Sequence, residues 1–181
     1  MVPLETIIKI NNEEDLVSLE LCAKDYLELL DNFYYNYAEG NYFILCAYHD
    51  ENLVGLLIAD KKAQKLDSLE KILPIVFLKL IYVVPKYRKQ NIGRKLLTTF
   101  INIEKSKKTA SIIITLPVNY IDGIKFFQKF GFHEKKKIKN SIFLIKNLWD
   151  DYGIRDIDLL GSSFFQNPYS LMNLFLLYLD L

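Results

Sequence analysis

The residues with the clearest chemical potential form the segment Tyr-Arg-Lys-Gln-Asn-Ile-Gly at 87–93. It follows an apolar, β-branched run at 80–84 that stops at Pro85, and it leads into a helical pattern from Ile92 to Lys105. The first N–H groups of a helix have no intrahelical acceptor and carry the positive end of the peptide dipoles, so they can bind an anion without a metal. The sequence therefore predicts a phosphate-binding loop at this junction.

The charges of the chain are segregated, although the net charge is only +1. Residues 1–60 carry 12 acidic and 2 basic groups, residues 61–149 carry 5 acidic and 20 basic groups, and residues 150–181 carry 5 acidic and 1 basic group. This division indicates a polyanion bound by the middle of the chain and a cationic group received by the first third. The alternative is that the charges only form solvated faces.

Length and composition indicate one domain, because 181 residues with 51% apolar content suffice for one core and not for two ordinary domains. No stretch reaches the roughly 20 apolar residues that cross a bilayer, and the first residues do not resemble a signal peptide. We therefore expect a soluble protein of the cytoplasm or nucleus, with no membrane partner. Cys22 and Cys46 are expected to be buried thiols, and no spacing of His, Cys, Asp and Glu predicts a metal site.

Hydrophobic periodicity predicts an alternation of strands and helices without internal repeats. The turn His49-Asp50-Glu51-Asn52 joins two strands as a hairpin, and a polar segment at 60–72 precedes the longest strand. The expected strands are 5–10, 42–48, 53–59, 75–84, 111–116, 132–138 and 142–148. The expected helices are 13–38, as one helix or a pair, 92–106 and 121–130.

Two patterns carry a resemblance to a known family. The first, V-x-P-x-Y-R-x-x-G-x-G with paired leucines, is matched by Val83, Pro85, Tyr87, Arg88, Gly93, Leu96 and Leu97. The second, N-x-x-A-I-x-F-Y-x-K-x-G-F, is matched by Ile124, Phe126, Lys129, Gly131 and Phe132. With the element order, these patterns make residues 5–148 resemble the GNAT superfamily of acetyl-CoA-dependent N-acetyltransferases, and most closely the protein N-terminal acetyltransferases.

The resemblance implies an α/β (α+β) fold with one GNAT-like domain at 1–148. Its sheet would be mixed and mostly antiparallel, with six to seven strands, splayed at the central pair and flanked by helices. Residues 149–181 would be a C-terminal extension, in which an apolar helical pattern at 169–179 packs on the domain, on a partner or on a second copy.

The resemblance also implies where acetyl-CoA binds. The N–H groups from Arg88 to Arg94 would hold the pyrophosphate, with Gly93 allowing close approach of the backbone. The strand edge at Ile81 to Val83 would pair with the pantetheine amides. The implied cofactor-binding residues are Ile81, Tyr82, Val83, Arg88, Lys89, Gln90, Asn91, Ile92, Gly93, Arg94, Asn119, Phe126, Phe127 and Lys129.

The sequence departs from the family pattern at four positions. Asn91 replaces the first glycine of the loop, and asparagine tolerates the left-handed conformation best after glycine. Phe127 replaces the tyrosine that can protonate the leaving thiolate, Tyr120 stands in the place of the family's Asn, and Thr115 stands where related enzymes carry a Glu or His base. The candidate catalytic groups are therefore Tyr82, Thr115 and Tyr120, while His49 and His133 are expected to be exposed bystanders.

We expect an enzyme that transfers acetyl from acetyl-CoA to an amine. A protein or peptide N-terminal α-amine is favoured as the acceptor. Its pKa is about 8, against about 10.4 for a lysine side chain, so it needs a catalytic base far less, and the sequence offers no evident base. The aromatic residues at 33–37 either line the acceptor pocket or pack on the sheet. The alternatives are a small-molecule acetyltransferase of the polyamine or aminoglycoside type, and a CoA-binding module with little catalysis. A nucleic-acid partner is not expected, because no base-reading motif is present.

Overall fold

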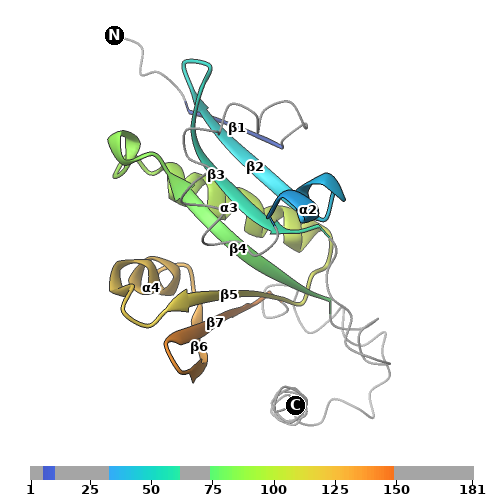
Figure 1. The fold of residues 1–181 in the computed structure, drawn as a ribbon, viewed down its shortest axis with the longest axis vertical. Helices are drawn as coiled ribbons and strands as arrows, with labels where there is room; N and C mark the ends of the chain where they lie inside the picture. Colours follow the sequence, from blue (N-terminus) through green and yellow to red (C-terminus); the bar gives the residue numbers. More distant parts are fainter. Residues whose placement is uncertain (1–5, 11–32, 62–73, 149–181) are drawn as a thin grey trace. The chain divides into compact units, whose positions relative to one another are not determined.

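The structure is a computed structural model, and it describes residues 6–10, 33–61 and 74–148 (Figure 1). Strands and helices alternate along these ranges as the sequence predicts. In chain order they are β1 (Ile7–Ile10), α2 (Phe33–Ala38), β2 (Tyr42–His49), β3 (Asn52–Asp60), β4 (Ile75–Val83), a 3-10 turn η3 (Pro85–Tyr87), α3 (Ile92–Ser106), β5 (Ser111–Pro117), α4 (Ile121–Gln128), β6 (His133–Ile138) and β7 (Ser141–Asn147).

The described strands form one sheet in the order β1-β2-β3-β4-β5-β7-β6. Every neighbouring pair is antiparallel except β4 and β5, which are parallel and are joined through α3. This arrangement confirms the expected fold class, a mostly antiparallel sheet flanked by helices.

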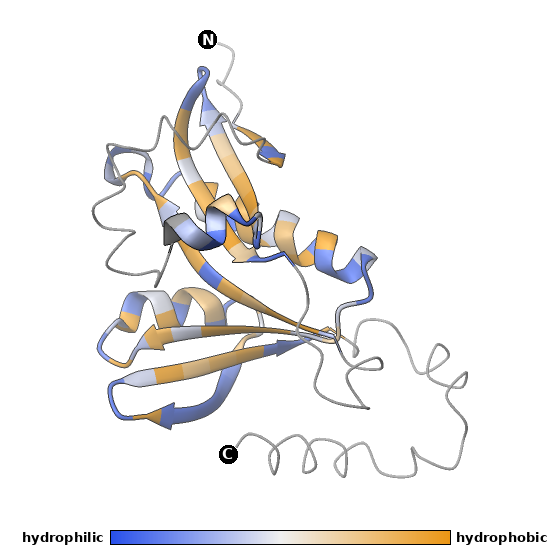
Figure 2. Cartoon of the chain, turned by 45° about the vertical axis from the view of Figure 1, so that its right-hand side comes forward, coloured by the Kyte–Doolittle hydropathy of each residue, from blue (hydrophilic) through white to orange (hydrophobic). Residues whose placement is uncertain are grey.

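Helix α3 covers one face of the sheet and contacts β2, β3 and β4. Its inward stripe includes Leu96, Leu97 and Phe100, all fully buried, and the Phe100 ring lies 6.1 Å from the ring of Phe43 in β2. The opposite face carries a second buried cluster, with Tyr37 of α2 packed against it. The residues of this cluster are Ile44, Cys46, Leu56 and Ile58. Figure 2 shows the hydrophobic character of these central strands.

Strands β4 and β5 pair only at their beginnings and then separate (Figure 1). Their register runs from Ile75 opposite Ser111 to Leu78 opposite Ile114, although β4 continues to Val83. A β-bulge marks the point of separation, because Ile58 and Ala59 of β3 pair with Leu80 and Leu78 and leave Lys79 as the extra residue. Bulges bend and twist a strand. We attribute the splay to this bulge, and the expected splay at the central pair is confirmed.

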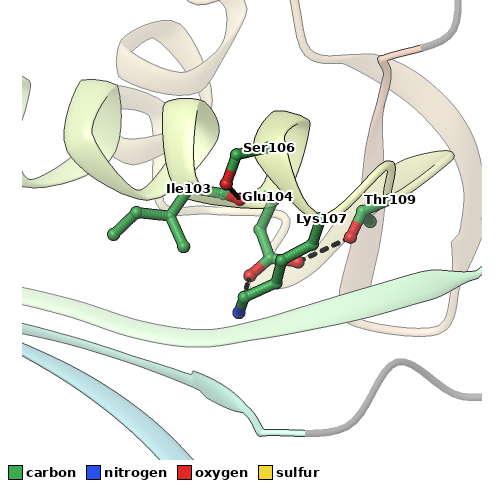
Figure 3. Close-up of polar contacts among 5 residues, drawn as sticks. All are labelled: Ile103, Glu104, Ser106, Lys107 and Thr109. Carbon is green, nitrogen blue, oxygen red and sulfur yellow. Dashed lines mark hydrogen bonds and ion pairs between the residues drawn. The ribbon is translucent and has the colours of Figure 1, made fainter.

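A buried carboxylate, that of Glu104, stabilises the C-terminal end of α3 (Figure 3). Glu104 is 2% exposed, and its two oxygens accept hydrogen bonds of 2.7 Å from the Lys107 ammonium and the Thr109 hydroxyl. The Lys107 ammonium also lies 4.6 Å from the centre of the Phe43 ring. Because both oxygens have partners, the carboxylate can be buried at a tolerable desolvation cost. These contacts hold the turn between α3 and β5.

Several expectations fall partly or wholly outside the described residues. Of the helical stripe expected at 13–38 only α2 is described. Most of the polar segment at 60–72, Cys22 and the extension at 149–181 lie outside the described residues. Helix α4 ends two residues earlier than expected, in a turn that closes at Gly131 with φ +81°. Among the helices within the described ranges, none is long and apolar enough to cross a membrane.

Candidate active site

The loop after β4 adopts the tight conformation that its sequence predicts. The N–H group of Tyr87 donates to the carbonyl of Val84 at 2.8 Å, which closes the 3-10 turn. Lys89 and Asn91 then take left-handed conformations, with φ of 63° and 62°. The Asn91 carbonyl accepts the first bond of α3 from the N–H group of Lys95 at 2.9 Å. Asn91 therefore supports the turn that glycine makes in the family pattern.

Six consecutive N–H groups follow without a protein acceptor among the described residues, those of Lys89 to Arg94. The Asn91 side chain does not cap α3 either. One expectation needs correction: the N–H group of Arg88 is not available, because it donates to the Pro85 carbonyl at 3.2 Å. The row of N–H groups from Lys89 to Arg94, called the amide row below, is what the loop offers to an anion.

Basic side chains surround the amide row, since residues 86–95 contain five Lys or Arg and no acid. The Arg94 guanidinium lies 5.6 Å from the Phe130 ring and so connects the start of α3 with the end of α4. Arg88 folds back on β4, where its Nε donates to the Val83 carbonyl at 3.0 Å and its guanidinium lies 5.9 Å from the Tyr82 ring. This charge favours a phosphate at the amide row.

Two glycines set how closely α3 approaches the strands. A Cβ atom at Gly55 of β3 would lie 2.9 Å from the Tyr82 carbonyl oxygen and 3.3 Å from Cγ2 of Ile92, so no side chain fits there. At Gly93 a Cβ atom would make ordinary contacts, 3.7 Å from Cζ of Phe126 and 3.8 Å from Cγ2 of Val83. Gly93 thus faces the space between the end of β4 and α4. Gly55 was missed, although a glycine inside a strand pattern signals close backbone approach.

The end of β4 presents a strand edge opposite the side that pairs with β3. The N–H group of Val84 donates to the Val54 carbonyl of β3 at 2.9 Å. Because N–H groups alternate in direction along a strand, those of Val83 and Ile81 point away from β3. Pairing with β5 has already ended at Leu78, so within the described sheet no strand covers this edge. The Val83 carbonyl is not available to a ligand at this edge, because the Nε of Arg88 already donates a hydrogen bond to it.

The candidate residues from the second pattern divide between core and surface. Phe126 is half-buried beside Gly93, whereas Phe127 is 4% exposed and its ring lies 5.3 Å from that of Phe132. Tyr120 is 55% exposed with its ring over Gly123. Asn119 and Lys129 are exposed at the two ends of α4. The structure therefore brings Val83, Gly93 and Phe126 together and leaves Tyr120, Asn119 and Lys129 on the surface.

Two of the three catalytic candidates share a face of the sheet. Leu78 and Ile114 are paired, so Thr115 projects to the opposite face from both. On the other side of the bulge in β4, Leu80 and Tyr82 project to the same face as Thr115. Both pack against the buried cluster that Tyr37 of α2 also contacts. Tyr82 and Thr115 therefore lie on the same face, on the two strands that separate. We call this face, with its row from Thr115 through Phe143 to Lys136, the acceptor face.

The two histidines differ. His133 is exposed at the start of β6, as expected. His49 was expected to be exposed in a turn, and this was wrong: it ends β2, its side chain is only 20% exposed, and its ring lies 5.5 Å from the ring of Tyr87. Its Nδ1 is buried without a hydrogen-bond partner among the described residues. This contact forms only because the hairpin folds over the 3-10 turn.

Burial shifts two ionisable groups. It raises the pKa of Asp60, against the opposing effect of the Lys79 ammonium 3.4 Å away. It also lowers the pKa of Lys135, the extra residue of a bulge in β6, and the positive charge of the neighbouring Lys136 lowers it further. Within the described residues no group of three His, Cys, Asp or Glu side chains could hold a metal.

An amide row at a helix start, next to a strand edge in a splayed sheet, can accept a phosphate-bearing carrier with an extended arm. The sequence profile of the Acetyltransferase (GNAT) domain matches residues 40–134, so the chain belongs to the GNAT acetyltransferase family. The resemblance inferred from the sequence is confirmed, and the chain is an acetyl-CoA-dependent acyltransferase. No curated protein sequence shows a significant match.

Solved structures share the fold. NAA60 from Arabidopsis thaliana, in complex with a bisubstrate analogue, is 16% identical with a TM-score of 0.63, over 79% of this chain and 98% of that one. Naa50 from the same plant, in complex with the bisubstrate analogue CoA-Ac-MVNAL, is 20% identical with a TM-score of 0.65, over 79% and 99%. The PaiA N-acetyltransferase from Thermoplasma acidophilum, in complex with coenzyme A, is 19% identical with a TM-score of 0.60, over 79% and 99%.

Proposed function

We propose that this chain transfers the acetyl group of acetyl-CoA to the N-terminal α-amine of a protein or peptide. The observation that carries the proposal is the adjacency of the amide row, Lys89 to Arg94, to the uncovered edge at Ile81 and Val83. The amide row would bind the pyrophosphate of CoA, and the strand edge would pair with the amides of its pantetheine arm. The thioester would then enter the gap between β4 and β5.

The reaction needs little more than orientation. The neutral amine attacks the thioester carbonyl carbon, the C–S bond breaks, and the thiolate takes up a proton while the new ammonium group loses one. An N–H group of the β4 edge, at Ile81 or Val83, would stabilise the developing oxyanion. Positioning of both reactants would supply much of the acceleration.

The side chains near this gap favour an α-amine as acceptor. Thr115 and Tyr82, on the acceptor face, are weak bases at neutral pH, and Phe127 cannot donate a proton. At pH 7.5 about a quarter of an α-amine with a pKa near 8 is neutral, against about one part in a thousand of a lysine side chain. A site without a strong base therefore suits the α-amine. The similarity to NAA60 and Naa50, both solved with bisubstrate analogues, supports the same class.

The test is a competition among acceptors. The purified chain is incubated with acetyl-CoA and three amines: a peptide with a free N-terminus and no lysine, the same peptide blocked at its N-terminus but carrying one lysine, and spermidine. Thiol release and product mass are followed. Modification of the free N-terminus in preference to the other two is expected. Preference for spermidine would support a small-molecule acetyltransferase, and tight CoA binding without thiol release would support a CoA-binding module.

A further inference from the structure

The amide row receives little support from its own side chains. Lys89, Gln90 and Asn91 are exposed, and the Asn91 side chain does not cap α3. The row is anchored on the helix side by Ile92, which is 1% exposed, and on the other side it follows the 3-10 turn that ends at Tyr87. The direction in which its first N–H groups point therefore depends on how firmly Tyr87 is held.

Tyr87 is half-buried, and the structure places two side chains beside its ring. The Lys86 ammonium lies 5.2 Å from the ring centre, but Lys86 is exposed. The His49 ring lies 5.5 Å from the Tyr87 ring, with an angle of 54° between the two planes. Because the His49 side chain is only 20% exposed, it is the more firmly packed of the two neighbours. This contact joins the tip of the β2–β3 hairpin to the loop that begins the amide row.

Hydrogen bonding does not explain the position of the His49 ring. Its Nδ1 is buried without a partner among the described residues. Its Nε2 lies 3.8 Å from the Asp50 carboxylate, which is beyond hydrogen-bond distance. A hydrogen on Nδ1 would have no acceptor there, so the arrangement favours the tautomer with its hydrogen on Nε2. Burying a nitrogen without a partner lowers stability, so the stability of the hairpin does not account for this residue.

The hairpin turn that follows His49 is strained. Asp50 and Glu51 both adopt left-handed conformations, with φ of 49° and 65°. A two-residue turn of this kind favours asparagine and glycine, and glutamate has the properties of neither. A hydrogen bond from the Asn52 side-chain amide to the Asp50 carbonyl, at 2.9 Å, supports the turn. Strained backbone and unpartnered buried polar atoms gather at functional sites, and both occur here next to the candidate phosphate loop.

We infer that His49 is a positioning residue for the coenzyme. Through its contact with Tyr87 it fixes the turn before the amide row, so that the N–H groups are oriented for the diphosphate before CoA binds. Pre-organisation of this kind reduces the free-energy cost of ordering a loop on binding. The effect should appear in the affinity for CoA rather than in the chemical step. The inference rests on the diphosphate site proposed above, at the amide row, and it is independent of the acceptor.

The experiment measures CoA affinity by titration calorimetry in His49→Ala, Tyr87→Ala and the double variant. Each single change should weaken binding by about two- to tenfold, the range that an aromatic contact supplies. The loss in the double variant should fall short of the product of the two single losses, because both changes remove one contact. His49→Phe should keep most of the affinity, since it retains a ring beside Tyr87, and His49→Gln should not. His133→Ala is the matched control, because His133 is exposed at the start of β6.

Kinetics and unfolding separate positioning from a purely structural role. In His49→Ala the KM for acetyl-CoA should rise, while kcat at saturating acetyl-CoA and the KM for the acceptor should stay within about twofold of the wild type. A purely structural role would lower the thermal unfolding temperature and leave CoA affinity unchanged. Tyr87→Ala and His49→Gln remove the same contact, so the affinity test stands even if His49→Ala does not fold.

The outcomes distinguish this inference from the coenzyme site on which it rests. Unchanged CoA affinity in His49→Ala, an equal loss in His49→Phe, or losses that multiply in the double variant would overturn the role of His49. Loss of CoA binding in Gly93→Glu would still support the amide row as the diphosphate site. Wild-type affinity in Gly93→Glu would instead overturn that site, and this inference with it.

Discussion

Gly55 of β3 packs between Tyr82 of β4 and Ile92, the first residue of α3: a Cβ atom there would lie 2.9 Å from the Tyr82 carbonyl oxygen and 3.3 Å from Cγ2 of Ile92. The amide row begins beside this contact, so the position of the row relative to the edge of β4 depends on a glycine 37 residues earlier in the chain. The start of α3 can lie this close to the sheet because the neighbouring strand lacks a side chain at this position.

Gly55→Ala should therefore destabilise the fold. The added Cβ meets a backbone oxygen that cannot move alone, and overpacking of this kind costs about 1–3 kcal/mol in the free energy of unfolding. Urea unfolding followed by circular dichroism measures the change, and titration calorimetry should show weaker CoA binding. Gly93→Ala is the control for the stability measurement, since its Cβ makes ordinary contacts. If Gly55→Ala unfolds at the same urea concentration as the wild type, the close contact is not real.

Gly93→Glu should abolish CoA binding while the fold persists. Its side chain would start between Val83 and Phe126 and bring a negative charge to the site proposed for the diphosphate. Calorimetry with CoA measures the affinity, and thermal unfolding checks the fold. Thr98→Glu, an exposed position of the same helix, adds the same charge away from the amide row. Wild-type affinity in Gly93→Glu, or an equal loss in both variants, would show that the phosphates bind elsewhere.

The local features of this site were predictable from the sequence, and the long-range ones were not. The left-handed turn at Asn91 and the helix start depend on neighbouring residues, so the motif contained them. The bulge at Lys79 depends on how β4 aligns with β3, and the burial of His49 depends on a hairpin folding over Tyr87. No periodicity in one segment encodes such pairings. The splay was expected only through the resemblance to a family.

Phe127→Tyr should test whether a missing proton donor limits the rate. A general acid contributes about 10²–10⁴-fold, so a correctly placed phenol should raise kcat at saturating substrate. Phe127 is buried among Phe126 and Phe132, and a hydroxyl group without a partner there should cost about 1–3 kcal/mol of stability. Steady-state kinetics and thermal unfolding give the two quantities. Phe132→Tyr, a second buried position in the same cluster, controls for the added hydroxyl. A stability loss with unchanged kcat would show that protonation of the thiolate is not limiting.

Lys135→Met should stabilise the fold, with a defined dependence on pH. Burial lowers the pKa of Lys135 in the folded state, so between that pKa and the ordinary lysine value of 10.5 the unfolded chain binds more protons. The destabilising contribution of Lys135 is therefore full below the folded pKa and fades as the pH rises toward 10.5. Lys135→Met should thus be more stable than the wild type at pH 7, and the difference should shrink at pH 10. Urea unfolding at both pH values measures it, with Lys139→Met in the exposed turn before β7 as the control. A difference that stays constant or grows with pH would contradict the assigned burial.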